Sequence, residues 1–150
     1  QQFSIVFAVV GIGMAIAGQI TNILAGRVKD EKLLFAGLMQ SFIFSIVFLV
    51  GILQNWNIYI LLAALLLTET GLPSASAASF SLAMRGHGKA AGSVSALLGF
   101  FSTISGGIIA PVVGIAGPNT ALPTAITIFV CETIAMIAFM GMIKGKSSHK

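Results

Sequence analysis

Residues 58 to 73 decide the fold of this chain, and they read IYILLAALLLTETGLP. The first ten are almost wholly apolar and do not alternate with polar residues, which favours a membrane helix over a barrel strand. The run then meets an acid, Glu69, and four residues later a proline, Pro73. A carboxylate in hydrocarbon costs about 2.5–3.5 kcal/mol, so chains that keep one usually place it against water or a partner inside a helix bundle. We therefore predict a transmembrane helix with a binding site near its middle.

The composition of the whole chain agrees with a membrane location. Of its 150 residues, 57% are hydrophobic and 8% are charged, and the mean hydropathy is +1.02. A soluble domain is about 25% charged, so the sequence indicates an all-α integral membrane protein. A helix needs about 20 residues to cross the hydrocarbon core. Five segments have that length: residues 3–25, 33–53, 56–84, 90–116 and 121–143.

Basic residues alternate between the connecting segments. Those at 26–32 and 85–89 and in the C-terminal tail contain Arg27, Lys29, Lys32, Arg85, Lys89, Lys144, Lys146 and Lys150, whereas 54–55 and 117–120 contain none. Basic loops stay in the cytoplasm. We therefore expect a multi-pass protein of the cell inner membrane, with the 26–32 and 85–89 loops and the C-terminus cytoplasmic.

Several function classes lack the residues that they need. The two histidines, His87 and His149, and the single Cys131 are scattered, so no metal site is expected. No phosphate-binding Gly-x-x-x-x-Gly-Lys motif is present, and the basic loops are too sparse for nucleic acid. We expect no enzyme activity and no cofactor.

Three other polar residues inside the spans are candidates to contact protons or substrate. Gln19 and Asn22 lie about one turn apart in the first span, and Glu132 lies in the fifth. Each has a plainer interpretation, because polar side chains also hydrogen-bond between membrane helices. Glu69 too could be a protonated carboxyl that makes one structural hydrogen bond.

Small residues and prolines indicate where helices pack or bend. Pro73 removes a backbone donor and clashes with the carbonyl of Glu69, so we expect a kink or a loosened turn there. Gly99 and Gly107 belong to a four-residue repeat in the fourth span that predicts close helix packing, and Pro111 adds a bend or a gating hinge. The second span is apolar on all sides, so we expect it to be a peripheral, lipid-facing scaffold.

The chain begins at Gln1 and enters an apolar segment almost at once. An odd number of spans that starts outside the cell leads us to expect further spans upstream.

Two motifs carry a resemblance to a known family. Residues 91–100 read AGSVSALLGF and residues 117–123 read GPNTALP. With them, the chain resembles the C-terminal half of a major facilitator superfamily transporter, and looks most like the bicyclomycin/chloramphenicol-resistance (Bcr/CflA) branch of drug:proton antiporters. The resemblance covers the whole chain as spans eight to twelve of twelve, most of the C-terminal six-helix bundle, with the N-terminal half missing.

The resemblance also implies roles for the candidates. The third span corresponds to a helix that lines the family's central cavity, which strengthens the case for Glu69. The first span flanks that cavity, which places Gln19 and Asn22 near it. The fifth span corresponds to a peripheral helix, which weakens the case for Glu132. The 26–32 loop stands where the family often repeats a gating motif, which is degraded here.

The sequence therefore predicts a proton-coupled efflux transporter, whose partners are the lipid bilayer, protons, a small organic substrate and the missing N-terminal helix bundle. One alternative is a major facilitator transporter of a sugar, nucleoside or other metabolite. A second alternative, of another class, is a non-transporting membrane scaffold or an inert half-gene product.

Overall fold

The computed structural model describes residues 2–25, 27–84, 90–114 and 121–147. These residues form five helices: α1 (Gln2–Ala25), α2 (Asp30–Leu53), α3 (Ile58–Met84), α4 (Ala91–Gly114) and α5 (Leu122–Ser147). All five are long and apolar enough to cross a membrane, and the described residues contain no strand. The predicted all-α fold is confirmed. The 85–89 and 117–120 loops and residues 148–150, which enter the charge prediction, lie outside the described residues.

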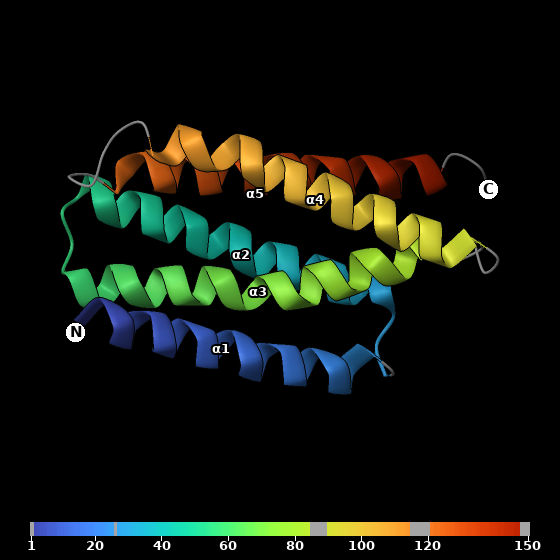
Figure 1. Cartoon of the computed structure of the whole chain (residues 1–150), viewed down its shortest axis with the longest axis horizontal. Coiled ribbons are helices and arrows are strands. Elements are labelled where there is room, and N and C mark those ends of the chain that lie inside the picture. Colours follow the sequence, from blue (N-terminus) through green and yellow to red (C-terminus); the bar gives the residue numbers. More distant parts are fainter. Residues whose placement is uncertain (1, 26, 85–89, 115–120, 148–150) are drawn as a thin grey trace.

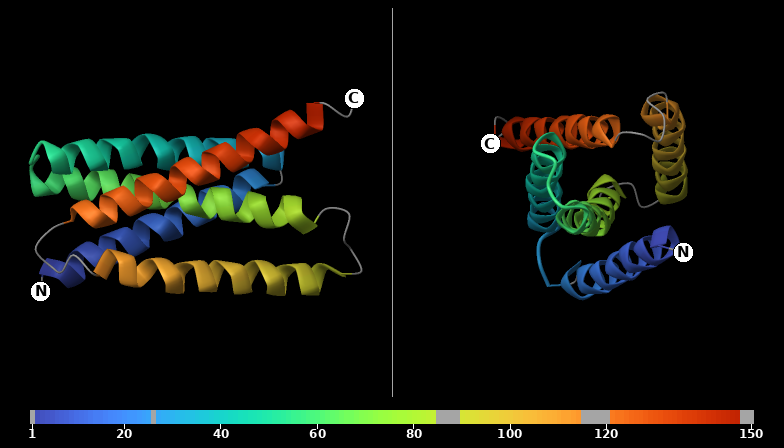
Figure 2. Two further views of the ribbon diagram at one scale, coloured as in Figure 1. Left: turned by 90° about the horizontal axis from the view of Figure 1, so that it is seen from above. Right: turned by 90° about the vertical axis from the view of Figure 1, so that its left-hand side faces the viewer.

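The helices run side by side as a bundle with α3 at its centre (Figure 1). The end-on view in Figure 2 shows α2 on one side of α3 and α1 on another, with α5 next to α2. α4 lies at the edge, and none of its described side chains is buried. α3 therefore has α1, α2 and α4 as its main neighbours, and α5 packs chiefly on α2.

The closest helix contact joins α2 and α3. A Cβ atom on Gly37 would lie 2.8 Å from the backbone nitrogen of Ala75, and one on Gly71 would lie 2.7 Å from the carbonyl oxygen of Gly37. Only glycine permits backbones to approach this closely. Ser41, which is 1% exposed, donates a hydrogen bond across the contact to the carbonyl of Thr68 at 2.9 Å.

Two apolar clusters extend this contact toward α5. One joins all three helices and consists of Leu33, Leu34, Leu38, Ala75, Ala78, Met136 and Phe139. The other consists of Phe48, Ala64 and Ala125. Stacked rings link α2 to α5, with centroids 5.8 Å apart for Phe35 and Phe139 and 5.9 Å apart for Phe42 and Phe129.

The expectation that the second span is a peripheral scaffold is wrong. α2 has the largest buried share of the five described helices, because it lies between α3 and α5. Its buried positions include Gly37, Ser41 and Ser45, which follow one another at four-residue spacing. The other residues of α2 are as apolar as residues that face lipid, so the buried face could not be recognised from hydrophobicity.

A tight turn connects α2 to α3. The backbone N–H of Gln54 donates to the carbonyl of Val50, and that of Trp56 donates to the carbonyl of Gly51. Asn55 has a φ of 52°, a left-handed conformation that asparagine tolerates better than most residues. Trp56 and Tyr59 are exposed at this end of the bundle, where an interfacial aromatic belt is expected.

Candidate functional site

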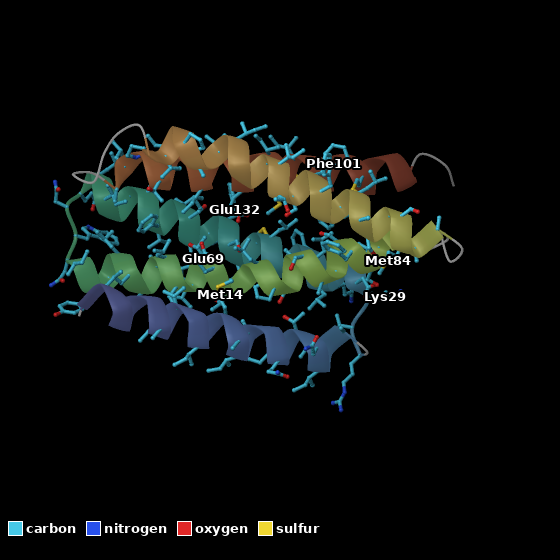
Figure 3. The ribbon with its side chains drawn as sticks, viewed as in Figure 1. Met14, Lys29, Glu69, Met84, Phe101 and Glu132 are labelled. Carbon is cyan, nitrogen blue, oxygen red and sulfur yellow. The ribbon has the colours of Figure 1, made fainter. Side chains whose placement is uncertain are left out.

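A cavity of about 270 Å³ lies between α3, α4 and α5. Two acids, Glu69 and Glu132, line it from different helices, and Figure 3 shows both near the middle of the bundle. The other lining side chains are three threonines, four aliphatic residues and a cysteine: Thr68, Thr124, Thr127, Leu72, Ile109, Val113, Ile128 and Cys131. The cavity therefore combines ionisable groups with a largely apolar wall.

The register of α3 explains how Glu69 reaches this cavity. Its neighbour Thr68 is 2% exposed and donates its hydroxyl to the carbonyl of Ala64 at 2.9 Å. Since Thr68 and Gly71 form the buried face toward α2, the Glu69 side chain is left at the cavity that α4 and α5 close. No described residue donates a hydrogen bond to its carboxyl group.

Glu132 on α5 shares the cavity and is 8% exposed. Its side chain and that of Glu69 line the same cavity from two different helices. As for Glu69, no described residue donates a hydrogen bond to it. The resemblance implied a peripheral helix for this residue, whereas the structure brings it together with Glu69.

Gln19 and Asn22 do not reach this cavity. Both side chains are exposed on α1, and neither is among the residues that line the cavity. Thr21, between them in sequence, takes the inward position at 2% exposure and forms a hydrogen bond of 2.7 Å with the hydroxyl of Ser74. A substrate-contacting role for Gln19 and Asn22 stays a prediction.

A second polar group lies where α1, α2 and α3 meet. Gln40 donates its amide to the hydroxyl of Thr70 at 2.8 Å and to the carbonyl of Leu67 at 3.1 Å. A second cavity of about 340 Å³ lies here and is lined by Gln40, Thr70, Ser74, Gly13, Ile16, Ala17 and Ile20. Sequence reasoning missed this group, although Gln40 is a single amide in an apolar span and could have been found by that signal.

The C-terminal part of α3 is also hydrogen-bonded to α2. Asp30, which is 6% exposed in the first turn of α2, accepts a hydrogen bond from the hydroxyl of Ser81. The contact ties the first connecting loop to the end of α3. It is separate from both cavities.

Two prolines were predicted to bend helices, and two glycines of α4 were predicted to pack closely on a neighbour. α3 continues through Pro73 and α4 continues through Pro111. A Cβ atom on Gly99 or Gly107 would have no described atom within 4 Å, beyond its own helix. The close packing predicted for these glycines, and the kinks predicted at the prolines, stay predictions.

The described residues do not bring three His, Cys, Asp or Glu side chains together in a way that could hold a metal ion. What the cavity can do chemically is bind a proton or a cationic group at its two carboxyls. The apolar wall can contact the hydrocarbon part of a bound molecule.

The fold and this cavity define a multi-pass helical membrane protein with ionisable groups inside its bundle. Over 144 residues, 96% of its length, the chain is 30% identical to the protein described as "Uncharacterized MFS-type transporter YdgK" of Bacillus subtilis (strain 168). This similarity supports membership of the major facilitator superfamily (MFS), and gives no support to the bicyclomycin/chloramphenicol branch in particular. The chain spans about a third of that relative, 36% of its length. No protein-family model matches the chain, and no solved structure matches it.

Proposed function

We propose that this chain is the C-terminal part of a proton-coupled secondary transporter of the MFS type. In such transporters two helix bundles rock around a site near the midplane, so that a small molecule reaches each side of the membrane in turn. The similarity to an MFS-type transporter supports the class. The observation that carries the coupling is the position of Glu69, whose carboxyl lines a cavity inside the bundle instead of lying at a helix end.

The proposal includes a direction and a cargo. We propose export of a small, partly apolar compound in exchange for protons, as in the bicyclomycin/chloramphenicol branch. The largely apolar wall of the cavity supports such a cargo more than a sugar or nucleoside, which would need more hydrogen-bonding groups. The alternation of basic loops supports a cell inner membrane location with the 26–32 and 85–89 loops and the C-terminus in the cytoplasm.

The test uses the full-length polypeptide that carries these residues, purified and reconstituted into liposomes with a pH gradient. A panel of drugs, sugars, nucleosides and amines is offered, and a trapped pH dye follows proton movement. We expect one class of partly apolar compound to move, with protons moving in the opposite direction. Glu69→Gln should abolish the proton-coupled movement, because the amide keeps the shape but cannot exchange a proton.

Glu31→Gln is the matched control, since it makes the same acid-to-amide change in the first turn of α2, outside the cavity. It should transport as the parent does. Undiminished proton-coupled transport in Glu69→Gln would remove Glu69 from the mechanism. Movement of sugars or nucleosides alone would overturn the proposed cargo and favour a transporter of metabolites. No movement of any compound would favour the non-transporting scaffold.

A further inference from the structure

Glu132 has an unusual environment for a carboxyl group. It is 8% exposed, it lines the cavity between α3, α4 and α5, and no described residue gives it a hydrogen bond. Burying a polar group without a partner is costly, and burying a charge is costlier unless the charge is paired. A carboxyl that points into a cavity in this way is suited to a partner that the chain itself does not provide.

None of the described residues that line the cavity carries a positive charge that could pair with the two acids. α4 has no ionisable side chain in its described range, and Cys131 is the other titratable residue at the described wall. On α2 the charged residues, Asp30, Glu31 and Lys32, are confined to the first turn, away from the cavity. The pair therefore faces a space without a counterion among the described residues.

We infer that this cavity binds one small protonated amine, with Glu69 and Glu132 as its counter-charges and the aliphatic wall around its hydrocarbon part. One ammonium ion neutralises one of the two carboxyls, and a proton retained on the other neutralises the second. The wall that contacts hydrocarbon is formed by Leu72, Ile109, Val113 and Ile128. The volume of about 270 Å³ is just below the usual range of ligand sites, roughly 300–1,000 Å³, so the amine is small.

The lining residues favour an ammonium group that has N–H bonds over a quaternary one. Carboxylates accept charge-assisted hydrogen bonds, and the hydroxyls of Thr124 and Thr127 add further acceptors. Quaternary ammonium groups have no N–H to donate, and proteins recognise them through aromatic faces. The described residues that line this cavity include no aromatic side chain. The cavity is therefore expected to bind ammonium groups that can donate N–H hydrogen bonds in preference to quaternary ones.

This inference rests on the proposed function, because it names the substrate class of the same cavity, but binding can be measured without transport. It also gives a charge balance for exchange. When the pair holds two protons, entry of one ammonium ion releases one of them, and the net charge in the cavity does not change. Exchange of one ammonium ion for one proton is then electroneutral.

Cys131 provides a reporter inside the site, since it lines the cavity and is accessible. The full-length protein is labelled in detergent with a small maleimide, and the peptide that contains Cys131 is followed by mass spectrometry. Hexylammonium, hexyltrimethylammonium and neutral hexanol are added at increasing concentrations. We expect hexylammonium to slow the labelling of Cys131 in a saturable way, and the other two to have no effect at the same concentrations.

The variants Glu69→Gln and Glu132→Gln should each raise the half-effect concentration of hexylammonium by about tenfold or more, the effect of losing one charge-assisted hydrogen bond. Glu31→Gln should leave that concentration unchanged. Thermal unfolding tests whether each variant is folded. If Glu132→Gln does not fold, the comparison of Glu69→Gln with the parent and the comparison of the three ligands test the inference. Equal protection by all three ligands, unchanged protection in folded acid variants, or no protection by hexylammonium would overturn the inference.

The two proposals fail in different ways. Protection of Cys131 by hexylammonium in a protein that transports nothing would overturn the proposed function and leave this site standing. Transport of another compound by a protein whose Cys131 is not protected would overturn this site and leave the proposed function standing.

Discussion

Gly37 of α2 and Gly71 of α3 face one another so closely that neither position has room for a side chain. A Cβ atom on Gly37 would lie 2.9 Å from the carbonyl oxygen of Gly71, and one on Gly71 would lie 2.7 Å from the carbonyl oxygen of Gly37. In a membrane, helices associate through close packing of small residues because lipid is as apolar as leucine. This contact sets the position of α3, and with it the position of Glu69.

Adding a methyl group at this contact should therefore destabilise the bundle. We expect Gly37→Ala or Gly71→Ala to lower the free energy of unfolding by about 1–3 kcal/mol, the usual cost of overpacking. At both positions the atoms that a Cβ would meet include backbone atoms of the facing helix, which cannot move aside as the end of a flexible side chain does. Unfolding of the purified protein in mixed detergent measures the change.

Gly141→Ala is the control for this comparison. A Cβ atom there would have no described atom within 4 Å, beyond its own helix, and alanine has the higher helix propensity. Gly141→Ala should be neutral or slightly stabilising. Equal stability of Gly37→Ala, Gly71→Ala and the control would show that α2 and α3 are not this close.

The hydrogen bond from Ser41 to the carbonyl of Thr68 crosses the same contact. Ser41→Ala should lower stability by about 0.6 kcal/mol, the average measured for hydrogen bonds between membrane helices, and by at most about 1.7 kcal/mol. Ser102→Ala on α4 is the control, because Ser102 is exposed and no described residue bonds to its hydroxyl. The same unfolding measurement applies, and a larger loss in the control than in Ser41→Ala would contradict the assignment.

The number and extent of the helices could be predicted from the sequence, because bilayer thickness fixes their length. Which faces are buried could not be predicted from hydrophobicity. A side chain that faces lipid and one that faces a neighbouring helix are equally apolar, so α2 was expected at the periphery although it is the most buried of the described helices. The stripe formed by Gly37, Ser41 and Ser45 was the usable signal, and it resembles the stripe singled out on α4.

The candidate site was predictable in part. Glu69 could be found because an acid in an apolar run is costly. Its proximity to Glu132 could not, because the two acids lie on helices far apart in sequence and nothing local specifies which helices adjoin. Gln19 and Asn22 do not line this cavity, and the buried position between them on α1 belongs to Thr21, so their role stays a prediction.

The exposed stripe on α4 leads to a further prediction. Gly99 and Gly107 have no described atom near the position of a Cβ atom, beyond their own helix, yet they share the small-residue spacing of a packed face. If further helices of the full-length protein cover this stripe, Gly107→Leu should lower its unfolding temperature, because the larger side chain would separate the helices. Gly141→Leu on α5 serves as the matched control. Equal unfolding temperatures for the two variants would show that lipid, and not protein, covers α4.

The orientation in the membrane can be tested at the two ends of α2. Lys29 and Asn57 flank this helix and its following turn, and both side chains are exposed; Figure 3 labels Lys29. In a Cys131→Ser background, we expect Lys29→Cys to react with an impermeant maleimide only from the cytoplasmic side and Asn57→Cys only from outside, since basic loops stay in the cytoplasm. Permeabilised cells, in which both positions should react, provide the control. Reaction of both positions from the same side would show that α2 does not cross the bilayer, and reversed sides would show that the charge pattern does not set the orientation.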